Sequence, residues 1–294
     1  MVDIHLSTEE TGEQYLLWKR DCIANGSPDF LKPLVSIIIP CFDSESWLEA
    51  TLESALAQSW PVKEVICVND GSRDASLEIA ARFESRGVRI LDQPNRGASA
   101  ARNAGIGVAR GDYFQFLDAD DLLAPEKIER QVQALEELPG HLASCSWGRF
   151  EGEPATAEFR FEPVWGDFTP VDWLVCSWTG GGMMHPAAWL VPRAVAESAG
   201  GWNEALSLDD DGEYFCRVVL ASAGITFVAS ARTFYRTHSG ARISSLQGAH
   251  AALSSFTSCE LKERYLRARE DSPRTRRAIA SRYAHFAWEQ LAAS

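Results

Sequence analysis

The residues best suited to chemistry form a cluster of three carboxylates in the first half of the chain. Asp118, Asp120 and Asp121 lie just beyond residues 111–115, whose apolar run is typical of a buried strand. Carboxylates this close repel one another unless a cation or several backbone donors lie among them. An Asp-Ala-Asp pair at a strand end suits a hard divalent cation that is shared with substrate phosphates.

Two other interpretations of this cluster involve no phosphate ligand. The aspartates could cap the next helix, because Pro125-Glu126 is typical of a helix start. A calcium loop is a further alternative, since Glu129 is the twelfth residue counted from Asp118. Leu122 and Leu123 exclude it, because they replace the ligand and the glycine that such a loop requires. Taken alone, the cluster leaves both the metal–phosphate site and helix capping open.

A second acidic cluster, Asp209-Asp210-Asp211, precedes residues 214–223, whose apolar spacing predicts a helix. One aspartate is enough to cap a helix N-terminus and to compensate its dipole. Three in succession exceed that requirement, so we expect this cluster to have an additional function.

Composition limits the classes of partner. The chain has 294 residues, 46% of them apolar, with 28 basic and 41 acidic residues and a net charge of −13. Nucleic acid is excluded as the main partner, because binding it depends on neutralisation of phosphates by Lys and Arg. Seven cysteines show no metal-binding spacing and are expected to be reduced core thiols of a cytoplasmic protein. We find no signal peptide and no apolar run of membrane-spanning length, which predicts a chain without a transmembrane segment.

Strands and helices alternate through the segment that must position the acids. Residues 1–33 are a polar N-terminal extension in which 15–18 suggest a short helix. The predicted strands are 35–40, 64–68, 88–91 and 111–115, and the predicted intervening helices are 44–59, 74–85 and 98–109. Apolar strands in β–α repeats indicate a mainly parallel sheet covered on both faces, with ligands beyond the carboxyl ends of the strands. Polar clusters occur at three of those ends (40–43, 69–72 and 118–121), which favours the metal–phosphate interpretation.

Several ordered motifs resemble one family. Residues 35–43 (VSIIIPCFD), 68–72 (VNDGS), 95–105 (NRGASAARNAG) and 111–121 (GDYFQFLDADD) resemble the family 2 glycosyltransferases. The resemblance implies an α/β fold of GT-A type, with a Rossmann-like nucleotide-binding sheet merged with a mixed acceptor-side subdomain, plus C-terminal helices. It covers most of residues 34–240, divided into a donor-nucleotide half (34–124) and an acceptor half (125–240). Residues 241–294 form a C-terminal helical segment.

The resemblance also suggests a role for individual residues. It implies that Asp70 hydrogen-bonds the nucleotide base, and an acceptor-only carboxylate suits the imide N–H of uracil. Arg102 would face a donor phosphate and Asp118 the ribose or sugar. The metal would be Mn²⁺ or Mg²⁺, and Asp211 would be the general base. The implied donor-binding residues are Pro40, Cys41, Asp43, Asp70, Arg102, Asp118 and Ala119, and the implied metal ligands are Asp120 and His238.

The later part of the chain suggests the acceptor side. Residues 141–190 hold five tryptophans and a Gly180-Gly181-Gly182 run. Indole faces suit sugar rings, although most tryptophans are core residues. Strands are expected at 225–229 and 232–236, and two helices from about residue 247 carry an Arg-rich surface. That surface is a solvated face or, as the alternative, a peripheral contact with the inner face of an anionic membrane or a lipid-linked acceptor.

We therefore predict a metal-dependent, inverting glycosyltransferase of glycan or polysaccharide biosynthesis. It would use a nucleotide-sugar donor, with UDP favoured, and a sugar, glycan or lipid-linked acceptor. A sugar nucleotidyltransferase is less favoured, because residues 40–50 offer no Lys or Arg for a basic nucleotide loop. An inactive nucleotide-binding scaffold is disfavoured by the presence of both Asp120 and Asp211.

Overall fold

The structure is a computed structural model that describes residues 32–237 and 248–292. The predicted helix at 15–18 and the predicted metal ligand His238 lie outside the described residues.

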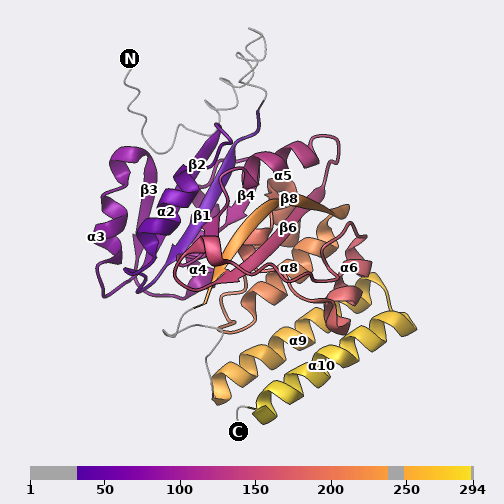
Figure 1. Cartoon of the computed structure of the whole chain (residues 1–294). Helices are drawn as coiled ribbons and strands as arrows, with labels where there is room; N and C mark the ends of the chain where they lie inside the picture. Colours follow the sequence, from indigo (N-terminus) through magenta and orange to yellow (C-terminus); the bar gives the residue numbers. More distant parts are fainter. Residues whose placement is uncertain (1–31, 238–247, 293–294) are drawn as a thin grey trace.

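The first half of the chain forms four strands of a five-stranded sheet (Figure 1). Its strands are β1 (Val35–Cys41), β2 (Lys63–Asp70), β3 (Val88–Gln93), β4 (Tyr113–Phe116) and β7 (Val191–Pro192), in the order β3-β2-β1-β4-β7. The first four pair in parallel, and β7 joins the edge antiparallel to β4. Every residue of β1 is buried, as its uninterrupted apolar sequence requires when both sheet faces are covered. The four predicted strands and the mainly parallel sheet are confirmed.

The connecting helices are α2 (Leu48–Leu56), α3 (Ser76–Ala81), α4 (Ala98–Val108) and α5 (Lys127–Leu135). The helix predicted over 74–85 is too long. After Ala81 the amides of Arg82 and Phe83 bond to carbonyls three residues back, and a short 3₁₀ turn (Glu84–Arg86) follows. Gly87, at φ 90°, then redirects the chain into β3.

A second sheet has the order β5 (Leu122–Leu123), β8 (Gly224–Arg236), β6 (His141–Phe150). The two strands predicted at 225–229 and 232–236 are wrong in number, because β8 is one continuous strand. Its register against β6 jumps from Cys145↔Val228 to Ser146↔Arg232. Residues 229–231 therefore bulge out of the pairing, which explains why the sequence pattern breaks there.

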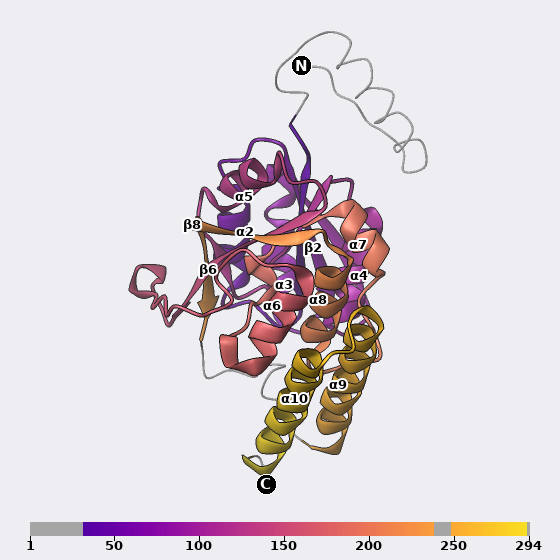
Figure 2. The same cartoon turned by 90° about the vertical axis from the view of Figure 1, so that its right-hand side faces the viewer.

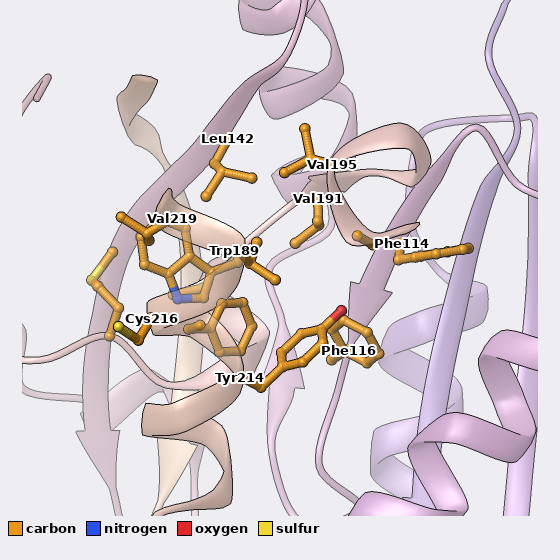
Figure 3. Packing of buried hydrophobic residues seen from close by; sticks show 14 of the residues in the cluster. Phe114, Phe116, Leu142, Trp189, Val191, Val195, Tyr214, Cys216 and Val219 are labelled. Carbon is orange, nitrogen blue, oxygen red and sulfur yellow. The ribbon is translucent and has the colours of Figure 1, made fainter. Parts of the chain in front are cut away.

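The hydrophobic core joins the second half of the chain to the first half. Helices α6 (Pro170–Cys176), α7 (Arg193–Ala199) and α8 (Asp210–Ala221) pack over it. Figure 3 shows Phe116 of β4 beside Tyr214 of α8, with Phe114, Trp189 and Leu142 in the same cluster. The expectation that the tryptophans of 141–190 are mostly core residues is confirmed: Trp147, Trp173 and Trp189 are buried, and Trp165 and Trp178 are half-buried.

Two long C-terminal helices complete the fold, α9 (Ala249–Arg269) and α10 (Pro273–Ala292). They lie side by side and extend from α8 and α6 (Figures 1 and 2). Both predicted helices are confirmed. Several of their arginines are engaged in ion pairs: Arg267 with Glu263 and Asp271, Arg274 with Asp172 and Glu270, and Arg276 with Asp271. Among the described residues, the search for a helix of membrane-spanning length and apolarity finds none.

Candidate active site

Parallel pairing brings the predicted acidic strand ends to one edge of the sheet. Cys41 at the end of β1 pairs with Asn69 near the end of β2, and Ile38 pairs with Phe116 at the end of β4. The loop that follows β4 begins with the Leu117 amide donating to the Ile38 carbonyl (3.0 Å). The loops at 40–43, 69–72 and 118–121 therefore open at the same edge, as the sequence predicts.

The carboxylate loop at 118–121 does not cap a helix. Its turn is closed by the Asp121 amide, which donates to the Asp118 carbonyl (3.1 Å), and β5 follows directly. Helix α5 begins only at Lys127, with Glu126 at its N-cap and no side-chain cap. The capping alternative is thus wrong. Asp118 and Asp120 are half-buried, whereas Ala119 between them is buried.

The third carboxylate of this loop, Asp121, is a buried anchor. One oxygen accepts from the Arg236 amide (2.9 Å), and the other lies 3.1 Å from Nδ1 of His185. The opposite ring nitrogen of His185 is 2.7 Å from the Thr233 hydroxyl. Burial raises the pKa of Asp121 to about 6, against the opposing effect of His185. Sequence reasoning missed this pairing, because no local pattern links residue 121 to residue 185.

Arg102 of α4 connects the two acidic clusters. Its guanidinium donates to Asp118 (2.8 Å) and to Asp210 at the start of α8 (3.0 Å), and it lies 4.3 Å from the ring centroid of Trp202. The side chain is buried, and although burial disfavours its charge, the two carboxylates hold the pKa of Arg102 above its usual value. The predicted contact with a donor phosphate stays a prediction, and it would require these carboxylates to share the guanidinium.

Close packing of α4 on the sheet puts Arg102 in this position. A Cβ at Gly105 would lie 2.5 Å from Cγ2 of Ile38, so only glycine lets the helix approach β1 this closely. The second glycine of the motif at 95–105 therefore has a packing function.

The three acids at 209–211 have different environments, although they are adjacent in sequence. Asp209 adopts a left-handed conformation (φ 59°) at the N-cap of α8, yet its side chain makes no capping hydrogen bond. Its carboxylate instead pairs with Lys262 of α9 and Arg282 of α10. Asp210 accepts from Ser99 (2.8 Å) and Arg102. Capping therefore accounts for neither residue.

Among the described residues, Asp211 differs from its neighbours because its carboxylate forms no ion pair. Within the described residues its carboxylate accepts one hydrogen bond, from the adjacent Gly212 amide (2.8 Å). Burial, followed by repulsion from Asp210 and Asp209, raises the pKa of Asp211 to about 7, with Arg102 opposing the change. Burial is thus the larger cause of the raised pKa, and repulsion from the neighbouring acids adds to it.

The residues predicted to bind the nucleotide are mostly engaged in holding loops together. Asp70 is buried and accepts from the Arg96 amide (2.9 Å), the Gly97 amide (2.7 Å) and Gln93 (2.7 Å). Asp43, at φ 45°, pairs with Arg73. Pro40 and Cys41 are buried in β1. Their predicted roles toward a donor stay predictions, and the geometry adds that Asp70 shapes the loop leading into α4.

The carboxylate loop suits a divalent cation only in part. The described residues contain no group of three His, Cys, Asp or Glu side chains that could enclose a metal ion. Asp118 and Asp120 nevertheless supply two half-buried carboxylates on alternate residues. Mg²⁺ is commonly held by one or two carboxylates plus substrate phosphates rather than by a complete protein cage. The residues present therefore fit a cation shared with a phosphorylated ligand. The other predicted metal ligand, His238, lies outside the described residues.

Comparison with known proteins shows where the chain has relatives. Residues 36–195 match the sequence profile of Glycosyl transferase family 2. An uncharacterized glycosyltransferase of Rickettsia felis is 32% identical over 249 residues, covering 82% of this chain and 41% of the relative. The uncharacterized glycosyltransferase EpsJ of Bacillus subtilis is 38% identical over 117 residues, covering 39% of this chain and 34% of the relative. The chain thus spans less than half the length of either relative.

Solved structures share the fold at low sequence identity. TarS 1–349 of S. aureus in complex with UDP-GlcNAc superposes with a TM-score of 0.66 at 17% identity, covering 79% of this chain and 70% of that one. The mannosyltransferase PcManGT of Pyrobaculum calidifontis, in complex with GDP-Man and Mn²⁺, gives a TM-score of 0.58 at 16% identity, covering 95% of this chain and 80% of that one. The predicted fold of GT-A type with C-terminal helices is confirmed.

Proposed function

The chain belongs to glycosyl transferase family 2, and on that premise we propose that it transfers a sugar from a nucleotide-diphosphate sugar to an acceptor hydroxyl with inversion at the anomeric carbon. UDP is the favoured nucleotide and glycan biosynthesis the favoured context. The observation that carries the proposal is the state of Asp211, a half-buried carboxylate that forms no ion pair within residues 32–237 and 248–292 and whose pKa is raised to about 7.

Asp211 has the properties that a general base requires. A base works best when its pKa lies near the operating pH, because it is then ionised and still holds a proton firmly. We assign Asp211 to accept the proton of the acceptor hydroxyl as that oxygen attacks the anomeric carbon. The attack comes from the face opposite the leaving diphosphate, in one displacement without a covalent enzyme intermediate.

Asp210 and Arg102 give the base its fixed position relative to the donor side. Asp210 is held by Ser99 and Arg102, and Arg102 is held in turn by Asp118. This chain of contacts links the start of α8 to the Asp-Ala-Asp loop. A donor that contacts Asp118 would therefore lie at a fixed distance from Asp211, which is the condition for a well-oriented attack.

Asp120, with Asp118 beside it, would hold the divalent cation, Mn²⁺ or Mg²⁺, which when bound neutralises charge on the departing diphosphate. In support, PcManGT has been solved with Mn²⁺ and a nucleotide sugar, and TarS with UDP-GlcNAc. These ligands are bound by proteins of the same fold, and we propose the same ligand class here.

The test is the Asp211→Asn variant, which keeps the size of the side chain and its acceptor for the Gly212 amide. Turnover, measured as UDP release from a panel of UDP-sugars in the presence of simple glycoside acceptors, should fall by roughly 10²–10⁴. UDP binding, measured by thermal shift, should be retained. NMR of the product should show an anomeric configuration opposite to that of the donor. Near-normal turnover, or retention of configuration, would disprove this mechanism.

A further inference from the structure

The C-terminal helices have no assigned task in the proposed chemistry, yet α9 contacts the loop that carries the catalytic acids. The Ser254 hydroxyl accepts from the amides of Ser207 (2.9 Å) and Leu208 (3.0 Å) and donates to the Leu208 carbonyl (2.9 Å). One turn further along α9, the Ser258 hydroxyl donates to the Asp209 carbonyl (3.1 Å) and carboxylate (2.9 Å). Residues 207–209 are therefore held by α9 through a row of hydrogen bonds.

Lys262, one more turn along the same face, completes this row. Its ammonium pairs with the Asp209 carboxylate, and its side chain is 3% exposed. Arg282 of α10 reaches the same carboxylate at 3.4 Å. Burial opposes ionisation of Asp209, but the charges of Lys262 and Arg282 outweigh it and hold the pKa of Asp209 below its usual value. Lys262 is thus enclosed by the fold, whereas the Asp209 side chain stays partly exposed.

The backbone of Asp209 needs this support. A non-glycine residue at φ 59° adopts a conformation that L-residues rarely occupy, although Asp tolerates it better than most. The site is also tightly packed, because a Cβ at Gly212 would collide with the Asp209 carboxylate and approach Lys262 Nζ to 3.2 Å. Such a conformation persists only where the surroundings enforce it, and here the surroundings are α9 and α10.

We propose that Lys262 is a positioning residue for the catalytic base Asp211, acting through Asp209, and that the C-terminal helical pair is part of the active site's supporting structure. This inference rests on the proposed function of Asp211. Asp209 is two residues from Asp211 and turns the chain into α8, so its conformation sets the direction of the base. Its neutralisation by Lys262 also limits the repulsion that Asp209 exerts on Asp211.

The charged groups around Asp211 determine how the Lys262→Met substitution should change its ionisation. Asp211 faces Asp210 and Asp209 from its own segment and Arg102 from α4, while Lys262 and Arg282 reach it only through Asp209. In Lys262→Met the Asp209 charge is less compensated. The ionised form of Asp211 is then less favourable, and its orientation is less restrained.

The experiment compares Lys262→Met with Arg269→Met, a matched control. Arg269 lies on the same helix and carries the same charge, but its side chain is exposed. We expect Lys262→Met to lower kcat by about 10- to 100-fold, the usual effect of a small misplacement of a catalytic group. KM for the UDP-sugar and the thermal shift by UDP should stay unchanged, and the acid limb of the kcat–pH profile should move to higher pH. Hydrogen exchange at residues 207–213 should become faster.

Two further variants separate positioning from loss of folding. Lys262→Arg should recover most of kcat, because a guanidinium can still pair with Asp209. The double variant Asp209→Asn/Lys262→Met should return the acid limb toward its original pH, because the uncompensated charge is gone. If Lys262→Met matches Arg269→Met in kcat and pH profile, the inference is wrong. Near-normal turnover of Asp211→Asn in the same assay would instead disprove the proposed role of Asp211 as the base. The inference about Lys262 would then fail for that separate reason.

Discussion

Replacement of Asp211 by Asn should stabilise the fold while it removes activity, and the gain should depend on pH. The folded-state pKa of Asp211 is raised from 3.8 to about 7. At about 1.4 kcal/mol per pH unit, this difference sets a ceiling of ~4 kcal/mol on the cost of the ionised carboxylate to folding. The Asn amide avoids this cost because it carries no charge. The gain in stability is smaller than the ceiling, because the N–H groups of the amide must still be buried.

The direction in which folding stability changes with pH follows from proton binding by Asp211. Between about pH 4 and pH 7 the folded state keeps a proton on Asp211 that the unfolded state has lost, so the stability of the wild type falls as pH rises. The Asp211→Asn variant lacks this term. Its advantage should be small near pH 4, widen by about 1.4 kcal/mol per pH unit, and level off above pH 7.

Urea and thermal denaturation of both proteins at pH 5 and pH 8 measure this difference. We expect the melting temperature of Asp211→Asn to exceed that of the wild type at pH 8, by about 2–4 °C for each kcal/mol gained. Asp210→Asn is the matched control, because Asp210 is paired with Arg102 and its loss should destabilise the protein. Equal stability of wild type and Asp211→Asn at both pH values would refute the view that the fold raises the pKa of Asp211.

Two further predictions concern the donor side. Turnover should require Mn²⁺ or Mg²⁺, and Asp120→Ala should abolish the response to metal titration; full activity in excess chelator would show that the loop at 118–121 holds no metal. UDP should raise the melting temperature more than GDP, ADP or CDP, and Asp70→Ala should weaken UDP binding by roughly 1–3 kcal/mol; equal shifts for all four nucleotides would contradict the uracil assignment.

The donor-side sheet could be predicted from the sequence because its signals are local. Strands such as 35–41 are continuous apolar runs, and parallel pairing then places their polar ends at one edge. The acidic clusters were found for the same reason, since each is a short run of carboxylates next to an apolar segment, after the strand at 111–115 or before the helix at 214–223.

The partners of those acids could not be predicted, because they are set by contacts between distant segments. Nothing near residue 121 indicates His185, and nothing near residue 209 indicates Lys262. The ion pairs of Asp209 and Asp210 likewise depend on how α9 and α4 pack on α8. The single strand β8 was missed for a related reason, because a bulge at 229–231 interrupts the alternation on which strand prediction depends.

The hydrophobic core has a consequence for how the protein gains and loses its structure. Both buried clusters cross the predicted boundary between residues 124 and 125: one joins Phe116 to Tyr214, and the other joins Ile39 to Ile128 and Leu190. Neither half can therefore complete its interior alone. We therefore expect the donor half and the acceptor half to unfold in one cooperative transition. The carboxylate loop at 118–121 and helix α8, which carries Asp211, should then form together during folding.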